Sequence, residues 1–184
     1  TFVHHDVTSE ADWANAVRAA EGLGGLHGLV NNAGIYQPKS LMQTDADLWE
    51  RHLRINQTGC FLGMQAVVPA MERLGGGSIV NLGSTGWQGK GGGFPCYAQA
   101  KSSVNGLTRG LAKPLGQDRI RINTVSPGLV MTERQMTLWL DAAGEDDLRR
   151  NQCLPDKLLP HDIARMVLFL ASDDAAMCTA QEFK

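Results

Sequence analysis

Residues 84–101 constrain this chain most, because they join an apolar strand to a helix through a glycine-rich loop. Residues 78–82 (Ser-Ile-Val-Asn-Leu) predict a buried strand, and Ser84 follows it closely. Tyr97 and Lys101 stand four residues apart on the next helix, so the phenol and the ammonium can face one pocket. A nearby ammonium favours the phenolate and lowers the phenol pKa, which suits a general acid or base. The Ser84 hydroxyl can hydrogen-bond the reacting oxygen.

The spacing of these three side chains resembles the active-site pattern of the short-chain dehydrogenase/reductase family. That pattern is Y-x-x-x-K with a serine thirteen positions before the tyrosine, and Ser84, Tyr97 and Lys101 match it. A Y-x-x-x-K pair alone is a weak signal, because ordinary residue frequencies place one in roughly one chain in a few of this length. The assignment therefore depends on further motifs in register with this one.

Those further motifs lie at predicted strand ends, where open α/β sheets bind their ligands. Residues 31–34 (Asn-Asn-Ala-Gly) match the family's N-N-A-G. Residues 6–7 match its D-V motif, which contacts adenine in relatives, and residues 127–132 match its P-G-x-x-x-T, which contacts the nicotinamide carboxamide. Each motif alone also fits a plain turn. The resemblance implies NAD or NADP as cofactor, with these binding residues: Asp6, Val7, Asn32, Ala33, Gly34, Tyr97, Lys101, Pro127, Gly128 and Thr132.

A polar residue within a predicted helix completes the catalytic set. Residues 44–74 predict a long helix that is capped by Thr44, with Asp47 three residues on, and is kinked at Pro69. Asn56 falls on the family's mid-helix asparagine, which in relatives helps to hold a water in the proton relay to the lysine. A mid-helix asparagine can also be an exposed polar residue, but its register with the other motifs favours the functional role. The resemblance thus implies four catalytic residues: Asn56, Ser84, Tyr97 and Lys101.

Strands and helices alternate along the chain. We predict strands over residues 1–7, 26–30, 78–82, 119–125 and 181–184. Ser9 and Asp12 predict a capping box for the first helix, and Pro160 predicts the start of the last, over residues 161–172. The helix over residues 94–112 is expected to end early because of Pro114.

This alternation predicts an α/β fold, a Rossmann-like doubly wound parallel sheet in three α/β/α layers. One domain covers residues 1–184, and the irregular segment over residues 131–159, which contains Trp139, is expected to be a mobile substrate lid. The family's T-G-x-x-x-G-x-G turn, which binds the cofactor pyrophosphate, has no match in the sequence. We therefore expect a fragment that is incomplete at the N-terminal side of the fold and binds cofactor poorly.

Two substrate classes are indicated by local resemblance. Residues 131–135, 151–155 and 168–182 look similar to bacterial aldose 1-dehydrogenases of the D-xylose or galactose type, which oxidise the anomeric carbon to a lactone. Residues 5–13 look similar to hydroxysteroid dehydrogenases, so a steroid or other bulky ketone is the alternative. Polar residues near the lid suit a sugar, although polar loop residues are usually just solvated. The expected substrate contacts are Ser84, Gln88, Tyr97, Arg134 and Asn151.

Composition and charge exclude several other classes. A formal net charge of −2 provides no electrostatic attraction for nucleic acid or an anionic membrane. The four cysteines are scattered and no histidines stand at ligand spacing, so we expect no metal site and a reducing cytoplasm. No apolar run reaches eighteen residues.

The resemblance also implies how the chain assembles. In relatives, the helices that correspond to residues 44–74 and 94–112 form a four-helix contact, so a homo-oligomer, a dimer or a tetramer, is expected. The alternative from another class is a non-catalytic short form that acts as a binding or assembly subunit. An intact set of asparagine, serine, tyrosine and lysine speaks against it, because a subunit without chemistry has no physical need for that set.

Overall fold

A parallel sheet lies at the centre of the chain. The computed structural model describes residues 1–90, 93–138 and 140–184, and within them four strands pair in the order β1-β2-β3-β4, all parallel. The strands are β1 (Gly28–Asn31), β2 (Gly77–Leu82), β3 (Ile120–Val125) and β4 (Glu182–Phe183). The helices are α1 (Glu10–Glu21), α2 (Ala46–Leu53), α3 (Gly59–Arg73), α4 (Pro95–Gln117), α5 (Glu133–Leu138), α6 (Ala142–Asn151) and α7 (Pro160–Ala171). Trp139 and two glycines of the loop before Tyr97 lie outside the described residues.

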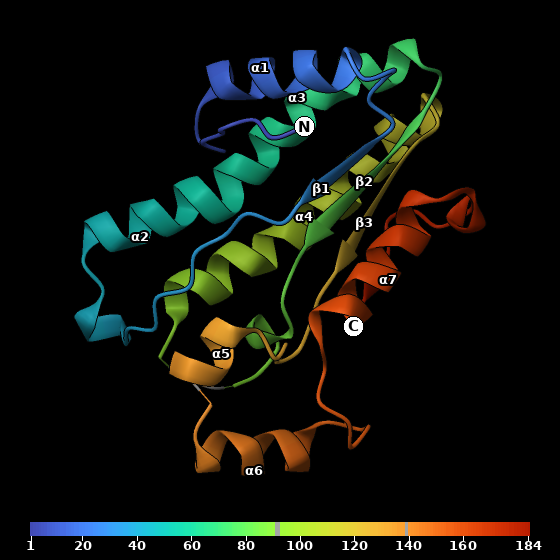
Figure 1. Ribbon diagram of the computed structural model, residues 1–184. Helices are drawn as coiled ribbons and strands as arrows, with labels where there is room; N and C mark the ends of the chain where they lie inside the picture. Colours follow the sequence, from blue (N-terminus) through green and yellow to red (C-terminus); the bar gives the residue numbers. More distant parts are fainter. Residues whose placement is uncertain (91–92, 139) are drawn as a thin grey trace.

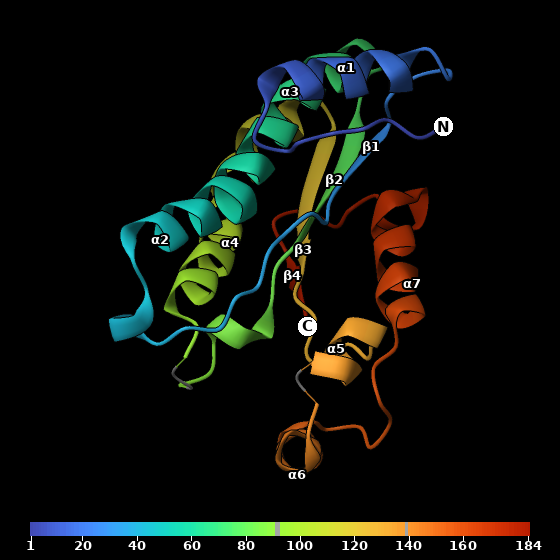
Figure 2. The same ribbon diagram turned by 60° about the vertical axis from the view of Figure 1, so that its left-hand side comes forward.

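Helices cover both faces of the sheet (Figures 1 and 2). One face packs against α3 and α4, with α1 along α3, and the other face packs against α7. The two helices of the predicted lid, α5 and α6, lie beyond the C-terminal ends of the strands (Figure 2). The predicted three-layer α/β arrangement is therefore confirmed.

Successive residues of the two central strands alternate between two cores. Ile79 and Ile122 join the core under α3 and α4, whereas Val80 and Val125 join Leu170 of α7 in the second core. Adjacent strand residues point to opposite faces, and a parallel sheet covered on both sides buries both sets. This explains why the strand predicted from residues 119–125 is buried almost throughout, although its sequence alternates.

The predicted long helix over residues 44–74 is divided into three parts. α2 is followed by a π-helical turn, η2 (Arg54–Thr58), which runs into α3. The predicted cap at Thr44 is wrong. Asp45 caps α2 by accepting a hydrogen bond from the amide of Leu48 at 2.8 Å, because the Thr44 hydroxyl donates instead to the Ser40 carbonyl at 2.9 Å. The π-turn, of a kind that recurs at functional sites, contains Asn56.

Two further predictions about elements are wrong. Residues 1–6 form no strand, because none of the described residues pairs with them; side-chain packing of His5 on Trp13, with ring centroids 4.2 Å apart, holds the segment instead. Pro114 does not end α4, which continues to Gln117. The proline removes one backbone hydrogen bond, but burial of Leu115 in the core beyond it favours the continued helix. By contrast, Ser9 caps α1 as predicted: the Asp12 amide donates to Ser9 Oγ at 3.2 Å. The second bond of the predicted capping box does not form, because the Ser9 amide donates to the Asp6 carbonyl at 3.0 Å instead.

No helix among the described residues is long and apolar enough to cross a bilayer.

At one edge of the sheet, β1 pairs only with β2 among the described strands, and Val30 is 45% exposed.

Candidate active site

A cavity of about 840 Å³ lies at the carboxyl edge of the sheet. Its lining comes from the ends of β1, β2 and β3, from the first turns of α4, and from α5 and α7. Parallel strands end at the same edge, so residues far apart in sequence meet there. Three predicted catalytic side chains, Ser84, Tyr97 and Lys101, all line this cavity.

Tyr97 stands in the first turn of α4, with its ring against a second tyrosine. The ring centroids of Tyr36 and Tyr97 are 5.0 Å apart in an edge-on arrangement. Burial raises the pKa of Tyr97 above its ordinary value, and hydrogen bonding with the Ser84 side chain lowers it by less. The expectation that Lys101 lowers this pKa is therefore wrong for the chain by itself. The ammonium Nζ lies 5.9 Å from the ring centroid, and loss of solvent around the phenol outweighs other effects.

Lys101 is buried at the base of the cavity, with 6% of its surface exposed. Its Nζ donates a hydrogen bond to the Leu82 carbonyl at 2.7 Å. Burial lowers the pKa of Lys101, and the neighbouring Cys60 raises it by less. The same burial raises the pKa of the Cys60 thiol to about 11, so Cys60 is a poor nucleophile at neutral pH. The Lys101 ammonium is held by the Leu82 carbonyl in the lining of the cavity, so it can also donate a hydrogen bond to a ligand hydroxyl.

Ser84 is fixed by the short turn that follows β2. Its Oγ caps the 3₁₀ turn η3 (Thr85–Trp87) by accepting a hydrogen bond from the Gly86 amide at 3.1 Å. Thr85 donates its amide and its hydroxyl to the Pro127 carbonyl, at 3.1 and 3.2 Å. These bonds attach the Ser84 loop directly to the predicted nicotinamide-binding turn.

Asn56 does not line the large cavity and instead binds the backbone of the loop beside it. Its Oδ1 accepts from the Ile35 amide at 2.7 Å, and its Nδ2 donates to the Ile35 carbonyl at 2.9 Å. A side chain on Gly34 would place its Cβ 3.0 Å from Asn56 Oδ1 and 3.7 Å from Lys101 Nζ. The asparagine therefore fixes the loop that carries Tyr36, and its side-chain amide is already paired.

The remaining predicted residues divide into three groups. Several line the large cavity with the catalytic residues: Asn32, Gly34, Pro127, Gly128, Thr132 and Arg134. A smaller cavity of about 190 Å³ shares Asn32 and Lys101 with it and is also lined by Val7, Ala33 and Asn56. Asp6, Gln88 and Asn151 line neither cavity.

The three side chains outside both cavities have other surroundings. Asp6 accepts hydrogen bonds from the amide and hydroxyl of Thr8, both at 2.9 Å, and these bonds lower the pKa of its carboxyl. Gln88 donates to Glu182 at 3.0 Å. Asn151 ends α6. The structure does not bring Gln88 and Asn151 to the predicted substrate position.

An apolar wall of the cavity was not predicted. It consists of Leu129 and Val130 after β3 together with Ile163, Val167 and Leu168 on α7. Tyr36, which covers Tyr97, was also missed. A lone aromatic residue directly after Asn-Asn-Ala-Gly was the available signal for Tyr36. The α7 residues carried no such signal, because an apolar helix face is usually just core.

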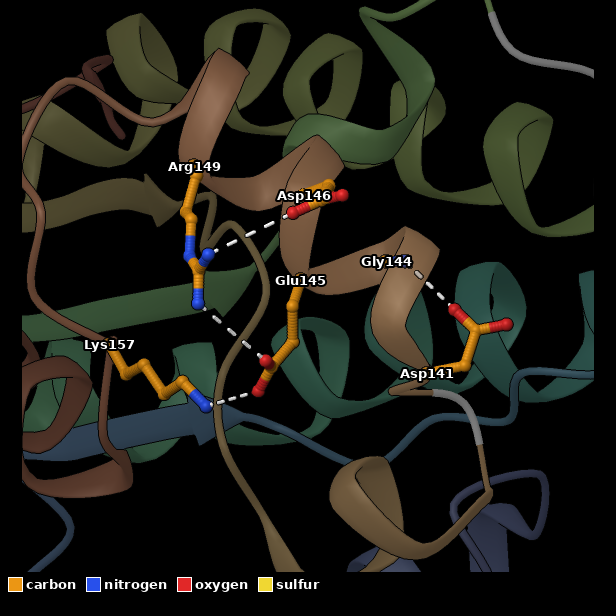
Figure 3. A network of polar contacts seen from close by, with 6 residues as sticks. All are labelled: Asp141, Gly144, Glu145, Asp146, Arg149 and Lys157. Carbon is orange, nitrogen blue, oxygen red and sulfur yellow. Dashed lines mark hydrogen bonds and ion pairs between the residues drawn. The ribbon is translucent and has the colours of Figure 1, made fainter.

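The predicted lid contains two helices rather than an irregular segment. Asp141 caps α6 by accepting from the Gly144 amide at 2.8 Å. Figure 3 shows Glu145 of α6 between Arg149 and Lys157, with Lys157 Nζ at 2.6 Å. This pairing lowers the pKa of the Glu145 carboxyl. A side-chain cap and exposed ion pairs stabilise α6.

The donors of this cavity fit the nicotinamide half of a dinucleotide. Lys101 and Tyr97 offer an ammonium and a phenol to ribose hydroxyls, and Thr132 offers a hydroxyl to a carboxamide. Val30, Leu82 and other apolar residues supply surfaces against which a flat ring can lie. No group of three or more metal-ligating side chains occurs in the described part of the chain.

Comparisons with known proteins place the chain in a family. A family profile described as "Enoyl-(Acyl carrier protein) reductase" matches residues 1–184. The probable galactose dehydrogenase GalD of Rhizobium meliloti (strain 1021) is 40% identical over 98% of this chain and 71% of its own length. A 3-alpha-(or 20-beta)-hydroxysteroid dehydrogenase of Mycobacterium tuberculosis (strain ATCC 25618 / H37Rv) is 40% identical over 99% of this chain and 68% of its own length.

Solved structures agree with this placement. A short-chain type dehydrogenase/reductase from Mycobacterium ulcerans superposes with a TM-score of 0.92 at 31% identity, over 97% of this chain and 66% of that one. The chain therefore belongs to the short-chain dehydrogenase/reductase family, and the predicted enzyme class, a dehydrogenase acting on CH–OH groups, is confirmed. It spans about two thirds of the length of these relatives.

Proposed function

We propose that this chain forms the catalytic part of an NAD- or NADP-dependent oxidoreductase that interconverts an alcohol and a carbonyl. The observation that carries the proposal is the convergence of Ser84, Tyr97 and Lys101 on one cavity at the carboxyl edge of the sheet. A non-catalytic assembly subunit would need neither the buried ammonium nor the covered phenol. The proposed roles below follow from the surroundings of each side chain.

Tyr97 is the proposed proton donor and acceptor. In the oxidation of an alcohol, the substrate hydroxyl proton passes to the Tyr97 oxygen; in the reduction of a carbonyl, the same oxygen returns it. A bound nicotinamide ring supplies the hydride chemistry. Ser84 orients the substrate oxygen, and Lys101 holds the ribose. Because burial raises the pKa of Tyr97, the phenol holds its proton more tightly, which suits the reduction of a carbonyl. The oxidation of an alcohol needs the phenolate, so its rate should rise with pH.

Asn56 supports the relay by positioning rather than by touching substrate. Its two hydrogen bonds to Ile35 fix the loop between β1 and α2. The proposed cofactor contacts are Asn32, Gly34, Lys101, Pro127, Gly128 and Thr132 in the large cavity, with Val7 and Ala33 at the smaller one. Asp6 remains a proposed adenine contact by resemblance.

An aldose is the proposed substrate. The similarity to a protein named a probable galactose dehydrogenase supports this class, and the polar side chains of Arg134 and Gln135 line the same cavity as Ser84. The anomeric hydroxyl would lie at Tyr97, and the other sugar hydroxyls would face these groups. The lid over residues 131–159 would then close over the sugar.

A hydroxysteroid or another bulky alicyclic alcohol is the second candidate. The apolar wall formed by Leu129, Val130 and the α7 residues favours it, because such a wall gives no partners to sugar hydroxyls. The similarity to a protein named a hydroxysteroid dehydrogenase is of the same strength as that to the sugar enzyme. The two classes differ in which part of the cavity the substrate body contacts.

Assembly and location are also proposals. A dimer or tetramer is supported by Phe61, an exposed aromatic side chain on α3. A cytoplasmic location is supported by the cysteines, all four of which are free. Sedimentation of the full-length protein would measure the assembly, and a monomer at micromolar concentration would contradict the proposal.

The decisive experiment is a spectrophotometric panel on the full-length protein that contains this chain. NAD and NADP are each combined with aldoses, with hydroxysteroids and with simple alicyclic alcohols, and nicotinamide reduction is followed. Activity that disappears in Tyr97→Phe supports the proposed chemistry. Activity on steroids alone would overturn the sugar assignment, and no activity with any alcohol or ketone would overturn the proposed function.

A further inference from the structure

One carboxylate joins three segments that each carry a site motif. Glu182 lies on β4, and its Oε1 accepts hydrogen bonds from three different side chains. Gln88 Nε2 donates at 3.0 Å, Asn105 Nδ2 at 3.1 Å and Ser126 Oγ at 2.6 Å. These donors lie 94, 77 and 56 residues from Glu182 in sequence, so the contact exists only in the folded chain.

Two of the donors, Gln88 and Asn105, lie on the same turn or helix as a catalytic side chain. Gln88 closes the turn that begins at Ser84, and its amide donates to the Thr85 carbonyl at 3.0 Å. Asn105 lies four residues beyond Lys101 on α4, so both side chains point from the same face of the helix. The carboxylate thereby links the serine turn to the helix that carries the tyrosine and the lysine.

The third donor joins the predicted nicotinamide turn to the same point. Ser126 is fully buried and directly precedes Pro127. The backbone packs tightly here, because a Cβ on Gly83 would lie 2.4 Å from Ser126 Oγ. A shift of Ser126 would therefore move both the turn at Pro127 and the start of the Ser84 loop.

The chemistry of the group suits this task. Hydrogen bonds to an ionised carboxylate are roughly twice as strong as those between neutral groups, and one oxygen can accept several. All three donors are neutral groups. All three hydrogen bonds can form together only when the three donor segments hold one position relative to β4, which carries the carboxylate.

We propose that Glu182 is a positioning residue that fixes the Ser84 turn, helix α4 and the Pro127 turn relative to one another. It touches neither cavity and acts through Gln88, Asn105 and Ser126. The proposal rests on the proposed function, since it concerns the geometry of that site. It also gives Gln88 a role in place of the substrate contact that the sequence indicated.

The first test compares Glu182→Ala with Gln181→Ala in the full-length protein. Gln181 is the neighbouring residue, and among the described residues its side chain donates only to the Thr179 carbonyl, at 3.0 Å. We expect kcat of Glu182→Ala to fall about 10-fold to 100-fold at saturating cofactor, because small misplacement of reacting groups has effects of that size. Gln181→Ala should keep kcat within about 2-fold, as surface changes usually do. Equal kcat values in the two variants and the parent would overturn the proposal.

Glu182→Gln and a double-mutant cycle separate positioning from general destabilisation. The amide oxygen of Glu182→Gln still accepts hydrogen bonds, so kcat should recover in part. Gln88→Ala should lower kcat in the parent protein but have almost no further effect in Glu182→Ala, because the shared contact is already lost. Fully additive effects would contradict a common role.

Hydrogen exchange provides a readout that does not depend on activity. In Glu182→Ala, the Thr85 and Gln88 amides should exchange faster than in Gln181→Ala, because the turn has lost its anchor. Unchanged exchange would overturn the positioning role even if the enzyme is active. A parent protein without dehydrogenase activity but with faster exchange in Glu182→Ala would instead overturn the proposed function and leave the anchor in place.

Discussion

The floor of the cavity and the proposed lid, residues 131–159, are built from different kinds of interaction. The floor consists of the strand ends and α4, where Lys101 is 6% exposed and Asn81 is fully buried. The lid helix α6 is held by ion pairs whose side chains are largely in water: Arg149 is 73% exposed and Lys157 is 51% exposed. Buried hydrogen bonds are costly to leave unmade, whereas exposed ion pairs add little.

This contrast indicates a division of labour within the proposed enzyme. The floor must hold reacting groups within fractions of an ångström, so it needs groups that cannot move without losing a buried partner. A lid over residues 131–159, as proposed, must admit and release a substrate, which weak exposed contacts allow. We therefore expect changes in the floor to affect kcat and stability, and changes in the lid to affect mainly KM.

The largest expected effect is on catalysis from the floor. Tyr97→Phe removes the proposed proton donor while keeping the ring, so kcat should fall by roughly 10²-fold to 10⁴-fold with the melting temperature little changed. Tyr36→Phe is the matched control, because it removes a phenol that packs against Tyr97 without a proposed proton transfer. Comparable kcat losses in both variants would contradict the assignment of the proton to Tyr97. Steady-state kinetics and thermal melts measure both quantities.

Asn81 tests the stability of the floor. It accepts from Asn31 Nδ2 at 2.9 Å and donates to Thr108 Oγ1 at 3.1 Å, and Thr108 in turn lies 2.8 Å from Thr124 Oγ1. Asn81→Ala leaves buried polar groups without partners, which should lower the free energy of unfolding by roughly 1–3 kcal/mol. Chemical denaturation measures the change, and Asn15→Ala on the exposed face of α1 is the control. A change within the error of that control would refute the importance of this network.

The phenols provide a test of desolvation. Burial raises the pKa of Tyr97, and burial together with the neighbouring Tyr97 raises that of Tyr36. Difference ultraviolet titration of the parent against Tyr97→Phe should thus give a Tyr97 midpoint above its ordinary value of 10.0. The folded state holds the Tyr97 proton more tightly than the unfolded state does. This proton therefore stabilises the fold fully below the unfolded-state pKa, and the stabilisation is lost as pH rises through the folded-state pKa. A midpoint below 10.0 would show that Lys101 dominates after all.

The smallest expected effect is in the lid. Lys157→Ala removes the partner of Glu145 at 2.6 Å, yet the melting temperature should fall by less than about 2 °C, because the pair is exposed. We expect a change in KM without a change in kcat. Arg165→Ala, which removes an exposed ion pair on α7 at 3.5 Å from Asp162, is the control for a general surface effect. A loss of stability equal to that of Asn81→Ala would remove the distinction between floor and lid.

Much of the floor was predictable because its signals are local. The four-residue spacing of Tyr97 and Lys101 places them on one helix face, and the strand before Ser84 is a short apolar run. The ends of parallel strands meet at one edge, so the convergence of these residues on one cavity followed from topology. The predicted cap at Thr44 failed because two adjacent residues could both cap, and only the contact of Thr44 with Ser40 decides between them.

The sequence by itself determined the family, the parallel sheet and the placement of the motifs at the carboxyl ends of its strands. Only the tertiary structure decided that α7 forms an apolar wall, that Gln88 binds Glu182 rather than the cavity, and that burial raises the pKa of Tyr97. Spacing along a helix or strand is fixed by backbone periodicity, which one segment contains. Cavity walls and desolvation depend on which distant segments meet, and no single segment contains that information.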